Sequence, residues 1–295
     1  MGCLPTLVQA QLSELYLSDR VTPIVYVVQN GRIVRQFNRS GQFDGPGCTV
    51  TDTVKFIGQD GGRVGQEYTL DGAPLDGRYT NPRFESLYDG ATDGERNWSI
   101  GHNDFPTNFA VVQGDADWDN VEVLFVPLRR SSGITYDGRN GTLWVTNTVG
   151  RGDRVQEYDL NGNLISEFNI DVSGGYGIAW DPADDTLWIP ASHGNTDLFQ
   201  YEKDGTLLQR VPVQGLTDIL LGAEFGAGGT RCTYTLRKSK PKGGCGACPQ
   251  PGESYRTQEE CETKRDCRKS VKTTIACPGG GNGTCKIKAK KRRCE

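Results

Sequence analysis

The chain has few of the residues that pack helices together or perform the commonest catalytic chemistry. Of its 295 residues only 1 is methionine and 2 are histidine, whereas 39 are glycine. Few long aliphatic runs together with abundant glycine indicate short strands joined by tight turns rather than packed helices. The sequence therefore predicts an all-β chain.

Several motifs of enzymes and membrane proteins are also missing. The chain contains no G-x-S-x-G nucleophile elbow, no phosphate-binding P-loop and no H-E-x-x-H zinc motif. No run of about 18 apolar residues is present, so no membrane span is expected. The N-terminal residues lack the basic and apolar regions of a secretory signal, and we expect no signal peptide in this chain. Serine-hydrolase, nucleotide and zinc-protease chemistry are therefore disfavoured.

Charge is distributed unevenly along the chain. Residues 231–295 hold 17 Lys and Arg against 6 Asp and Glu, and residues 1–230 hold 16 against 31, so the net charges are +11 and −15. Such asymmetry is typical of a basic tail that binds an acidic partner. A tail that is basic only for solubility is the alternative.

Cysteine is concentrated in the same basic tail. Eight of the ten cysteines lie there: Cys232, Cys245, Cys248, Cys261, Cys267, Cys277, Cys285 and Cys294. This density predicts a small disulfide-stapled module in an oxidising environment, with the connectivity left open. Zinc is the alternative for Cys245 and Cys248, but a second C-x-x-C pair and a tail histidine are missing. Cys3 and Cys48 lie outside the module and either bridge each other or stay free.

The larger part of the chain contains internal repeats. The sequence from Ile134 matches that from Ile178: Asp137 corresponds to Asp181, and Trp144 to Trp188, at an offset of 44 residues. Each unit reads as four short strands, which is the pattern of a propeller blade. We expect the two tryptophans to pack one blade against the next rather than to bind sugars.

A glycine turn marks each repeat, because a tight hairpin requires the positive φ that glycine adopts without strain. It recurs at Gly31, Gly72, Gly162 and Gly205, and less clearly at Gly114. These turns predict a β-propeller of five blades, with a sixth left open. Residues 20–38 supply only two strands of the first blade, and LTDILLGAEF after Val213 supplies another, so joining them would close the ring. An open solenoid is the alternative.

The expected organisation is an N-terminal segment at 1–19, a propeller at 20–230 and a basic cysteine-rich module at 231–295. The strings GIAWDP, TLWI and Y-x-x-x-G-x-L resemble the NHL, YVTN and SMP-30-like propellers over about residues 20–225. This resemblance implies the fold and no particular activity, because that group includes scaffolds, receptors and lactonases.

Candidate site residues are few, and none is predicted to be catalytic. His102 and His193 are expected in surface loops, with a shared metal or acid–base role as the alternative. Asp115, Asp117 and Asp119 alternate as oxygen ligands of calcium do, although the match to an EF-hand loop is incomplete and aspartate is also common in turns. Calcium is the one cofactor considered.

The sequence favours a non-enzymatic structural or adhesion protein of an extracellular assembly, such as a virion surface or tail component or a filament subunit. Its expected partners are other protein subunits, including further copies joined through the basic tail and the acidic propeller, with nucleic acid disfavoured. The interacting residues are expected to be Lys286, Lys288, Lys290, Lys291, Arg292 and Arg293. The alternatives are a metal-dependent lactonase-like hydrolase using the axial pocket and a lectin-like binding propeller.

Overall fold

The computed structural model is all-β across the residues that it describes and contains no helix there. The described residues are 13–39, 47–58, 64–80, 84, 86–103, 108–147, 154–172, 174–191, 196–217, 220–226, 231–243, 248, 250–251, 254–260, 270–276 and 284–294. The chain divides into unit 1, Met1–Ala227, and unit 2, Gly228–Glu295. No described segment forms a helix long and apolar enough to span a membrane.

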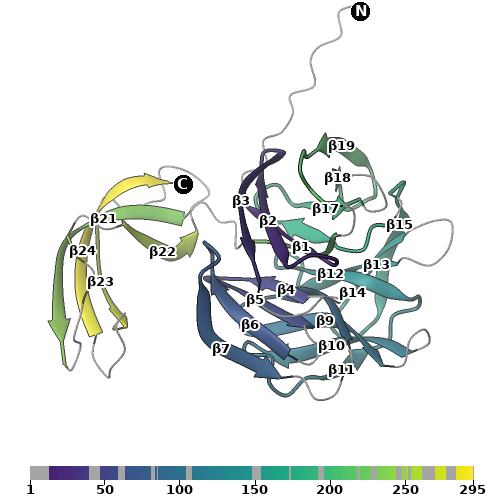
Figure 1. Cartoon of the computed structure of the whole chain (residues 1–295), viewed down its shortest axis with the longest axis horizontal. Coiled ribbons are helices and arrows are strands. Elements are labelled where there is room, and N and C mark those ends of the chain that lie inside the picture. Colours follow the sequence, from purple (N-terminus) through teal and green to yellow (C-terminus); the bar gives the residue numbers. More distant parts are fainter. Residues whose placement is uncertain are drawn as a thin grey trace, which may run out of the picture. The chain divides into compact units, whose positions relative to one another are not determined.

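The described part of unit 1 forms five antiparallel sheets of four strands each (Figure 1). Sheet 1 contains β20 (Leu220–Phe225), β1 (Leu15–Asp19), β2 (Ile24–Gln29) and β3 (Arg32–Asn38). Sheet 2 contains β4 (Gly47–Val50), β5 (Thr53–Gly58), β6 (Val64–Thr69) and β7 (Pro74–Thr80). Sheet 3 contains β8 (Ser86–Thr92), β9 (Arg96–Asn103), β10 (Asn108–Asp115) and β11 (Glu122–Phe125).

The two repeats that are clearest in the sequence form the remaining sheets of unit 1. Sheet 4 contains β12 (Ser131–Asp137), β13 (Thr142–Asn147), β14 (Arg154–Tyr158) and β15 (Leu164–Asn169). Sheet 5 contains β16 (Ala179–Asp181), β17 (Thr186–Pro190), β18 (Asp197–Tyr201) and β19 (Leu207–Pro212). Strand order within each sheet follows the chain, except that β20 precedes β1 in sheet 1.

The last strand is the most exposed strand in each sheet of unit 1. Every residue of β13 is buried, whereas β15 alternates between exposed and half-buried positions. Trp144 packs in one apolar cluster with Leu187 and Ile189 of the next sheet. The prediction that Trp144 and Trp188 join neighbouring sheets rather than face solvent is therefore confirmed, since each is 1% exposed.

The first strands of the five sheets lie next to one another in a cycle. β4 contacts β8, β8 contacts β12, β12 contacts β16, β16 contacts β20, and β20 contacts β4. β20 also pairs with β1 across the chain, with Leu15 opposite Phe225 and Leu17 opposite Ala223. Segments from the two ends of unit 1 thus share one sheet.

The structure adds a strand that the sequence analysis missed. β1 (Leu15–Asp19) pairs with β2 as well as with β20, so the N-terminal part of sheet 1 has three strands rather than the expected two. Residues 15–19 therefore belong to the sheet and not to a separate segment ending at residue 19. The LYLSD sequence is short, and its residues are buried on both faces, so it lacks the alternation that marks a half-buried strand.

Four of the five predicted glycine turns have the expected positive φ at glycine. Gly31, Gly72, Gly162 and Gly205 have φ between 70° and 90°. Their tips also pack closely on the neighbouring sheet: a Cβ added at Gly72 would lie 2.2 Å from Cγ of Phe37, and one at Gly205 would lie 2.7 Å from Cβ of Phe168. Glycine is thus required for close approach as well as for φ.

The expectation for Gly114 is wrong. Gly114 lies in β10 opposite Asn97, and the turn follows it at residues 116–121. Trp118 and Asn120 provide the positive φ values there, 60° and 54°. The Asp115 side chain holds this turn by hydrogen bonds, which lets residues other than glycine adopt the left-handed region.

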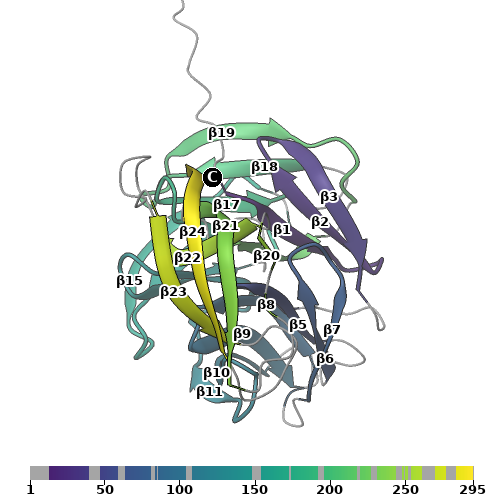
Figure 2. The same cartoon turned by 90° about the vertical axis from the view of Figure 1, so that its left-hand side faces the viewer.

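The described part of unit 2 is one four-stranded antiparallel sheet with the order β22, β21, β24, β23 (Figure 2). Its strands are β21 (Arg231–Lys242), β22 (Ser254–Glu260), β23 (Ser270–Ala276) and β24 (Thr284–Cys294). The two long strands pair along almost their whole length, from Cys232 opposite Cys294 to Lys242 opposite Thr284.

Candidate functional site

A buried carboxylate, Asp89, lies where the first strands of the sheets meet. It sits in a bulge of β8, because Tyr88 pairs with Ile100 and Ala91 with Trp98, which leaves Asp89 and Gly90 opposite the single residue Ser99. Asp89 has φ of 48°, and the Ser99 hydroxyl donates to its carbonyl at 2.7 Å. The bulge turns the Asp89 side chain away from the usual pleat.

Gly90 completes the bulge through close approach to sheet 2. A Cβ at Gly90 would lie 2.8 Å from the carbonyl oxygen of Cys48, and one at Gly47 would lie 2.5 Å from the carbonyl oxygen of Asp89. The two backbones can approach this closely only because both positions are glycine.

The Asp89 carboxylate accepts four main-chain hydrogen bonds. Three of the donors belong to sheets 1, 3 and 4, and the fourth lies immediately before β16 of sheet 5. Oδ1 accepts from the N–H of Gly90 at 2.9 Å and of Ala223 at 2.9 Å. Oδ2 accepts from the N–H of Ile134 at 3.0 Å and of Ile178 at 3.1 Å. Asp89 is fully buried, so these four donors replace the water that an ionised carboxylate requires.

A second acidic group, Glu224 of β20, lies buried in the same region. Its Oε2 accepts a long hydrogen bond of 3.4 Å from the Thr135 hydroxyl. That hydroxyl in turn accepts a hydrogen bond of 3.0 Å from the main-chain N–H of Trp180. Burial raises the pKa of both carboxyl groups, and the charge of Asp89 raises the pKa of Glu224 further. Four N–H donors favour the ionised form of Asp89, whereas Glu224 has a single hydroxyl donor. Of the two carboxyl groups, Asp89 is therefore the better stabilised in its charged form.

Cys48 is the free, buried cysteine of this region. Burial raises the pKa of its thiol, and the nearby carboxyl groups of Glu224 and Asp89 act in the same direction. A thiol in such surroundings stays protonated and unreactive. The predicted bridge to Cys3 involves a residue outside the described part of the chain.

His102 does not lie in a surface loop as expected. It belongs to β9, is 5% exposed, and its ring lies edge-on to Tyr88 with centroids 4.5 Å apart. Nε2 is 3.3 Å from the carbonyl oxygen of Ser131. Burial lowers the pKa of His102 to about 4, so the ring is neutral at pH 7. His193 lies outside the described residues.

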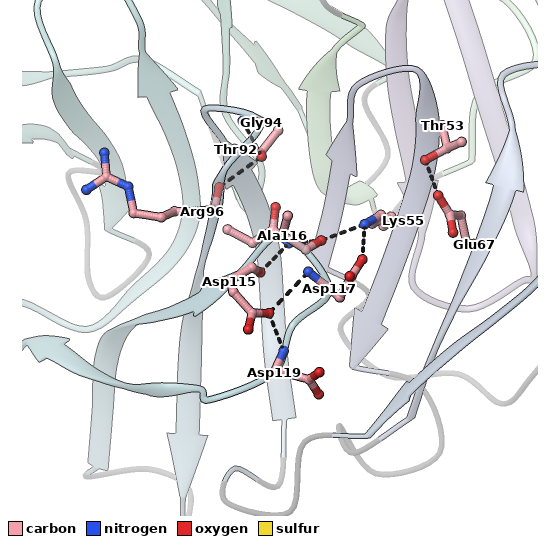
Figure 3. A network of polar contacts seen from close by, with 11 residues as sticks. Thr53, Lys55, Glu67, Thr92, Gly94, Arg96, Asp115, Ala116, Asp117 and Asp119 are labelled. Carbon is pink, nitrogen blue, oxygen red and sulfur yellow. Dashed lines mark hydrogen bonds and ion pairs between the residues drawn. The ribbon is translucent and has the colours of Figure 1, made fainter. Parts of the chain in front are cut away.

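The three aspartates considered for calcium form a capped turn (Figure 3). Oδ1 of Asp115 accepts from the N–H groups of Asp117 at 3.2 Å and Asp119 at 2.7 Å. Asp117 pairs with Lys55 of sheet 2 at 2.8 Å, and Lys55 also donates to the Ala116 carbonyl at 2.6 Å. Within the described residues, no three His, Cys, Asp or Glu side chains are grouped so that they could hold a metal ion. Calcium at this turn stays a prediction.

Of the predicted tail cysteines, the structure describes one bridge, between Cys248 and Cys285. Cys232 and Cys294 are backbone partners in the β21–β24 register. Cys245, Cys261, Cys267 and Cys277 lie outside the described residues. The bridge joins the start of β24 to the connection after β21, which spacing alone did not reveal.

Three of the predicted interacting residues lie on one side of unit 2. Lys286, Lys288 and Lys290 are exposed and alternate along β24 with buried Cys285, Ile287 and Ala289. Lys291, Arg292 and Arg293 belong to the same strand, but their side chains lie outside the described set.

Sequence reasoning missed Asp89 and Glu224. A signal for Asp89 was present, because an Asp-Gly pair inside the strand-like run SLYDGAT indicates a bulge. Glu224 is a single acid inside the apolar run LLGAEF. Neither signal shows that the two residues meet, because Asp89 and Ala223, the chain neighbour of Glu224, lie 134 residues apart in the sequence.

No protein-family model and no curated protein matches the sequence. Among solved structures, the chain is similar to a β-propeller in the nidogen/laminin complex, with a TM-score of 0.50, 10% identity, and coverage of 72% of this chain and 98% of that one. A luciferin-regenerating enzyme (TM-score 0.44, 14% identity, covering 78% and 85%) and apo AztD from Citrobacter koseri (0.43, 11%, 75% and 99%) also match, too distantly to support an argument. The first similarity and the sheets described above indicate a β-propeller fold. No family match confirms the resemblance to the NHL and SMP-30-like propellers.

Proposed function

We propose that unit 1 is a five-bladed propeller whose ring is closed by sheet 1. The cyclic contacts of the first strands support closure, as does the pairing of β1 with β20. The Gly31 turn of sheet 1 also packs on sheet 5, where an added Cβ would lie 2.7 Å from Val211. In a closed ring the edges of the first strands face one another and are covered by the neighbouring sheets, which protects them from edge-to-edge association.

The proposed role of this ring is that of a non-enzymatic scaffold. The observation that carries this proposal is the use of the Asp89 carboxylate, which binds four main-chain N–H groups at the axis of the proposed ring. In an axial enzyme site, a carboxylate would have to face a substrate or a metal ion. Here its accepting positions are occupied by the fold itself.

Unit 2 is proposed to be a connector that binds an acidic partner in an extracellular assembly. Support comes from its net charge of +11, from the exposed lysines of β24 and from the Cys248–Cys285 bridge, which suits an oxidising environment. A virion component and a filament subunit are both compatible with this role.

Metal binding and hydrolysis test the scaffold proposal. The purified chain is exposed to Ca²⁺, Mn²⁺ or Zn²⁺, analysed by native mass spectrometry, and assayed with a panel of lactones. We expect the mass of the chain alone and no hydrolysis above that of lactone without protein, both for the unchanged chain and for an exposed-site control, Asp204→Asn. A stoichiometric ion or hydrolysis that Glu224→Gln or Asp89→Asn abolishes, and that the control retains, would establish an axial enzyme site instead. An ion that both of these variants still bind would point to the Asp115 turn and not to the axis.

A further inference from the structure

Seven exposed lysines form one face of the unit 2 sheet, here called the lysine face. They are Lys238, Lys240 and Lys242 of β21, Lys272 of β23, and Lys286, Lys288 and Lys290 of β24. Their common orientation follows from the register, because Lys240 lies opposite Lys286 and Lys288 lies between Lys238 and Lys272. Residues directly opposite each other in antiparallel strands project from the same face.

The strand segments that carry the lysine face contain no acidic residue. The segments 236–242, 270–272 and 284–290 contain no Asp or Glu. Like charges directly opposite one another destabilise a sheet, by roughly 0.2–1 kcal/mol for each pair. The lysines are spaced about 7 Å apart along a strand and about 5 Å between strands. Such a dense array of positive charge is best stabilised by an extended acidic surface.

An extended acidic surface exists on unit 1. In each antiparallel sheet the turn after the first strand and the turn after the third lie at the same end, here called the turn end. The nine turns are residues 30–31, 51–52, 70–73, 93–95, 116–121, 138–141, 159–163, 182–185 and 202–206. Together they hold 11 Asp and Glu but only 2 Lys and Arg. The other connections between β1 and β20 hold 7 Asp and Glu and 7 Lys and Arg, so they carry no excess charge.

Contacts between sheets show that these turns adjoin one another. Lys55, near the start of β5 in sheet 2, pairs with Asp117 of sheet 3 at 2.8 Å, and Arg139 of sheet 4 pairs with Asp185 of sheet 5 at 3.1 Å. Asp71 of sheet 2 lies 3.7 Å from Arg35 of sheet 1, and its side chain is 88% exposed. The excess negative charge is thus gathered at one end of unit 1 and reaches solvent.

We propose that the lysine face of one copy of the chain binds the turn end of a second copy. This inference rests on the proposed scaffold-and-connector role and names the partner. A separate anionic polymer would neutralise the lysine face but not the excess negative charge of the turn end, whereas a second copy neutralises both. Because the interface is head to tail, association can continue from copy to copy.

Self-association of the full chain tests the proposal by sedimentation velocity over a range of protein and salt concentrations. We expect oligomers at about 0.05 M NaCl that dissociate at about 0.5 M NaCl, because salt screens exposed charges. The variant K286E/K288E should weaken association about tenfold or more. The control R20E/R129E makes the same change in net charge away from both surfaces and should associate as the unchanged chain does.

A mixing experiment identifies the second surface. The variant E95K/D119K/E202K changes exposed turn residues of sheets 3 and 5 and should not self-associate. Mixed with K286E/K288E, it should form heterodimers, because its intact lysine face meets the intact turn end of the other variant. Circular dichroism and the mass of the bridged chain check folding, and K286Q/K288Q provides a milder variant with the same expected direction.

Three outcomes would overturn the inference. One is a chain that stays monomeric at low salt, and another is association that K286E/K288E does not weaken. The third is a monomeric chain whose lysine face binds heparin, which would make an anionic polymer the partner. None of them affects the scaffold proposal, which fails only if the metal-binding and hydrolysis experiments reveal an axial site.

Discussion

Unit 1 and unit 2 are both built from four-stranded antiparallel sheets, but their sheets are stabilised differently. The sheets of unit 1 share apolar clusters with their neighbours, such as the one that joins Trp144 to Leu187 and Ile189. The sheet of unit 2 has few buried apolar side chains in its described part, namely Leu236, Ile287 and Ala289 beside the bridged Cys285, and lysines cover its other face. The apolar core therefore stabilises unit 1, whereas we expect unit 2 to depend on the Cys248–Cys285 bridge.

The largest expected effect comes from the axial carboxylate of unit 1. Asp89→Asn keeps the shape of the side chain but replaces one accepting oxygen with a donor, which leaves buried N–H groups unpaired. We expect a loss of about 2–6 kcal/mol in the free energy of unfolding of unit 1. All five tryptophans lie between residues 98 and 188, so tryptophan fluorescence during denaturation reports on unit 1 alone. A loss as small as that of Asp204→Asn would contradict the role given to Asp89.

Removal of the Cys248–Cys285 disulfide tests whether unit 2 depends on this bridge for its stability. Cys248→Ser with Cys285→Ser should destabilise unit 2 by about 2–5 kcal/mol, because the unfolded chain is no longer constrained. Hydrogen exchange in β21 and β24 should rise while tryptophan fluorescence stays unchanged. Cys48→Ala, which removes the free thiol of unit 1, is the matched control and should leave exchange in unit 2 unaltered. Equal destabilisation of both units would contradict the comparison.

Substitution of a turn glycine of unit 1 should lower stability less, by disturbing the packing between two sheets. Gly72→Ala places a Cβ against Phe37 and forces a residue with a side chain into positive φ. We expect a loss of about 1–3 kcal/mol, again measured by tryptophan fluorescence. Gly94→Ala shares the positive φ, but its Cβ would meet nothing within 4 Å, so it separates backbone strain from packing. If both variants lose the same stability, the turn does not pack as described.

His102 gives unit 1 a pH dependence that unit 2 lacks, because the two histidines of the chain both lie in unit 1. Burial lowers the pKa of His102 to about 4, so the folded state binds fewer protons than the unfolded state between about pH 6.5 and pH 4. Stability is therefore retained above this window and falls as the pH drops through it, by about 1–3 kcal/mol. His102→Gln should remove this part of the pH dependence. An unchanged slope in the variant would show that other groups cause it.

The sequence predicted those parts of the fold that repeat. TLW strands and glycine turns recur because each blade needs a buried central strand and a tight outer hairpin, and Trp144, Trp188 and four of the five glycines behaved as expected. The turn was wrongly placed at Gly114 because hydrogen bonds to Asp115 hold Trp118 and Asn120 at the positive φ that glycine adopts in the other turns. β1 was missed because a strand buried on both faces shows no alternation.

The axial residues were beyond prediction for a different reason. Asp89 is defined by its contacts with Ile134, Ile178 and Ala223, which are brought together only when the sheets assemble. His102 appeared to be a loop residue because SIGHNDF contains turn-forming residues, yet it extends β9 into the core. Local sequence carries little information about such long-range contacts.

Hydrogen exchange at the amides that bind Asp89 tests the central claim most directly. If Asp89 holds the first strands together at the axis of a closed ring, the N–H groups of Ile134, Ile178 and Ala223 should exchange only through global unfolding of unit 1, with one shared free energy. In Asp89→Asn all three should lose protection together. Independent local exchange of these amides in the unchanged chain, or protection that survives the substitution, would contradict the account.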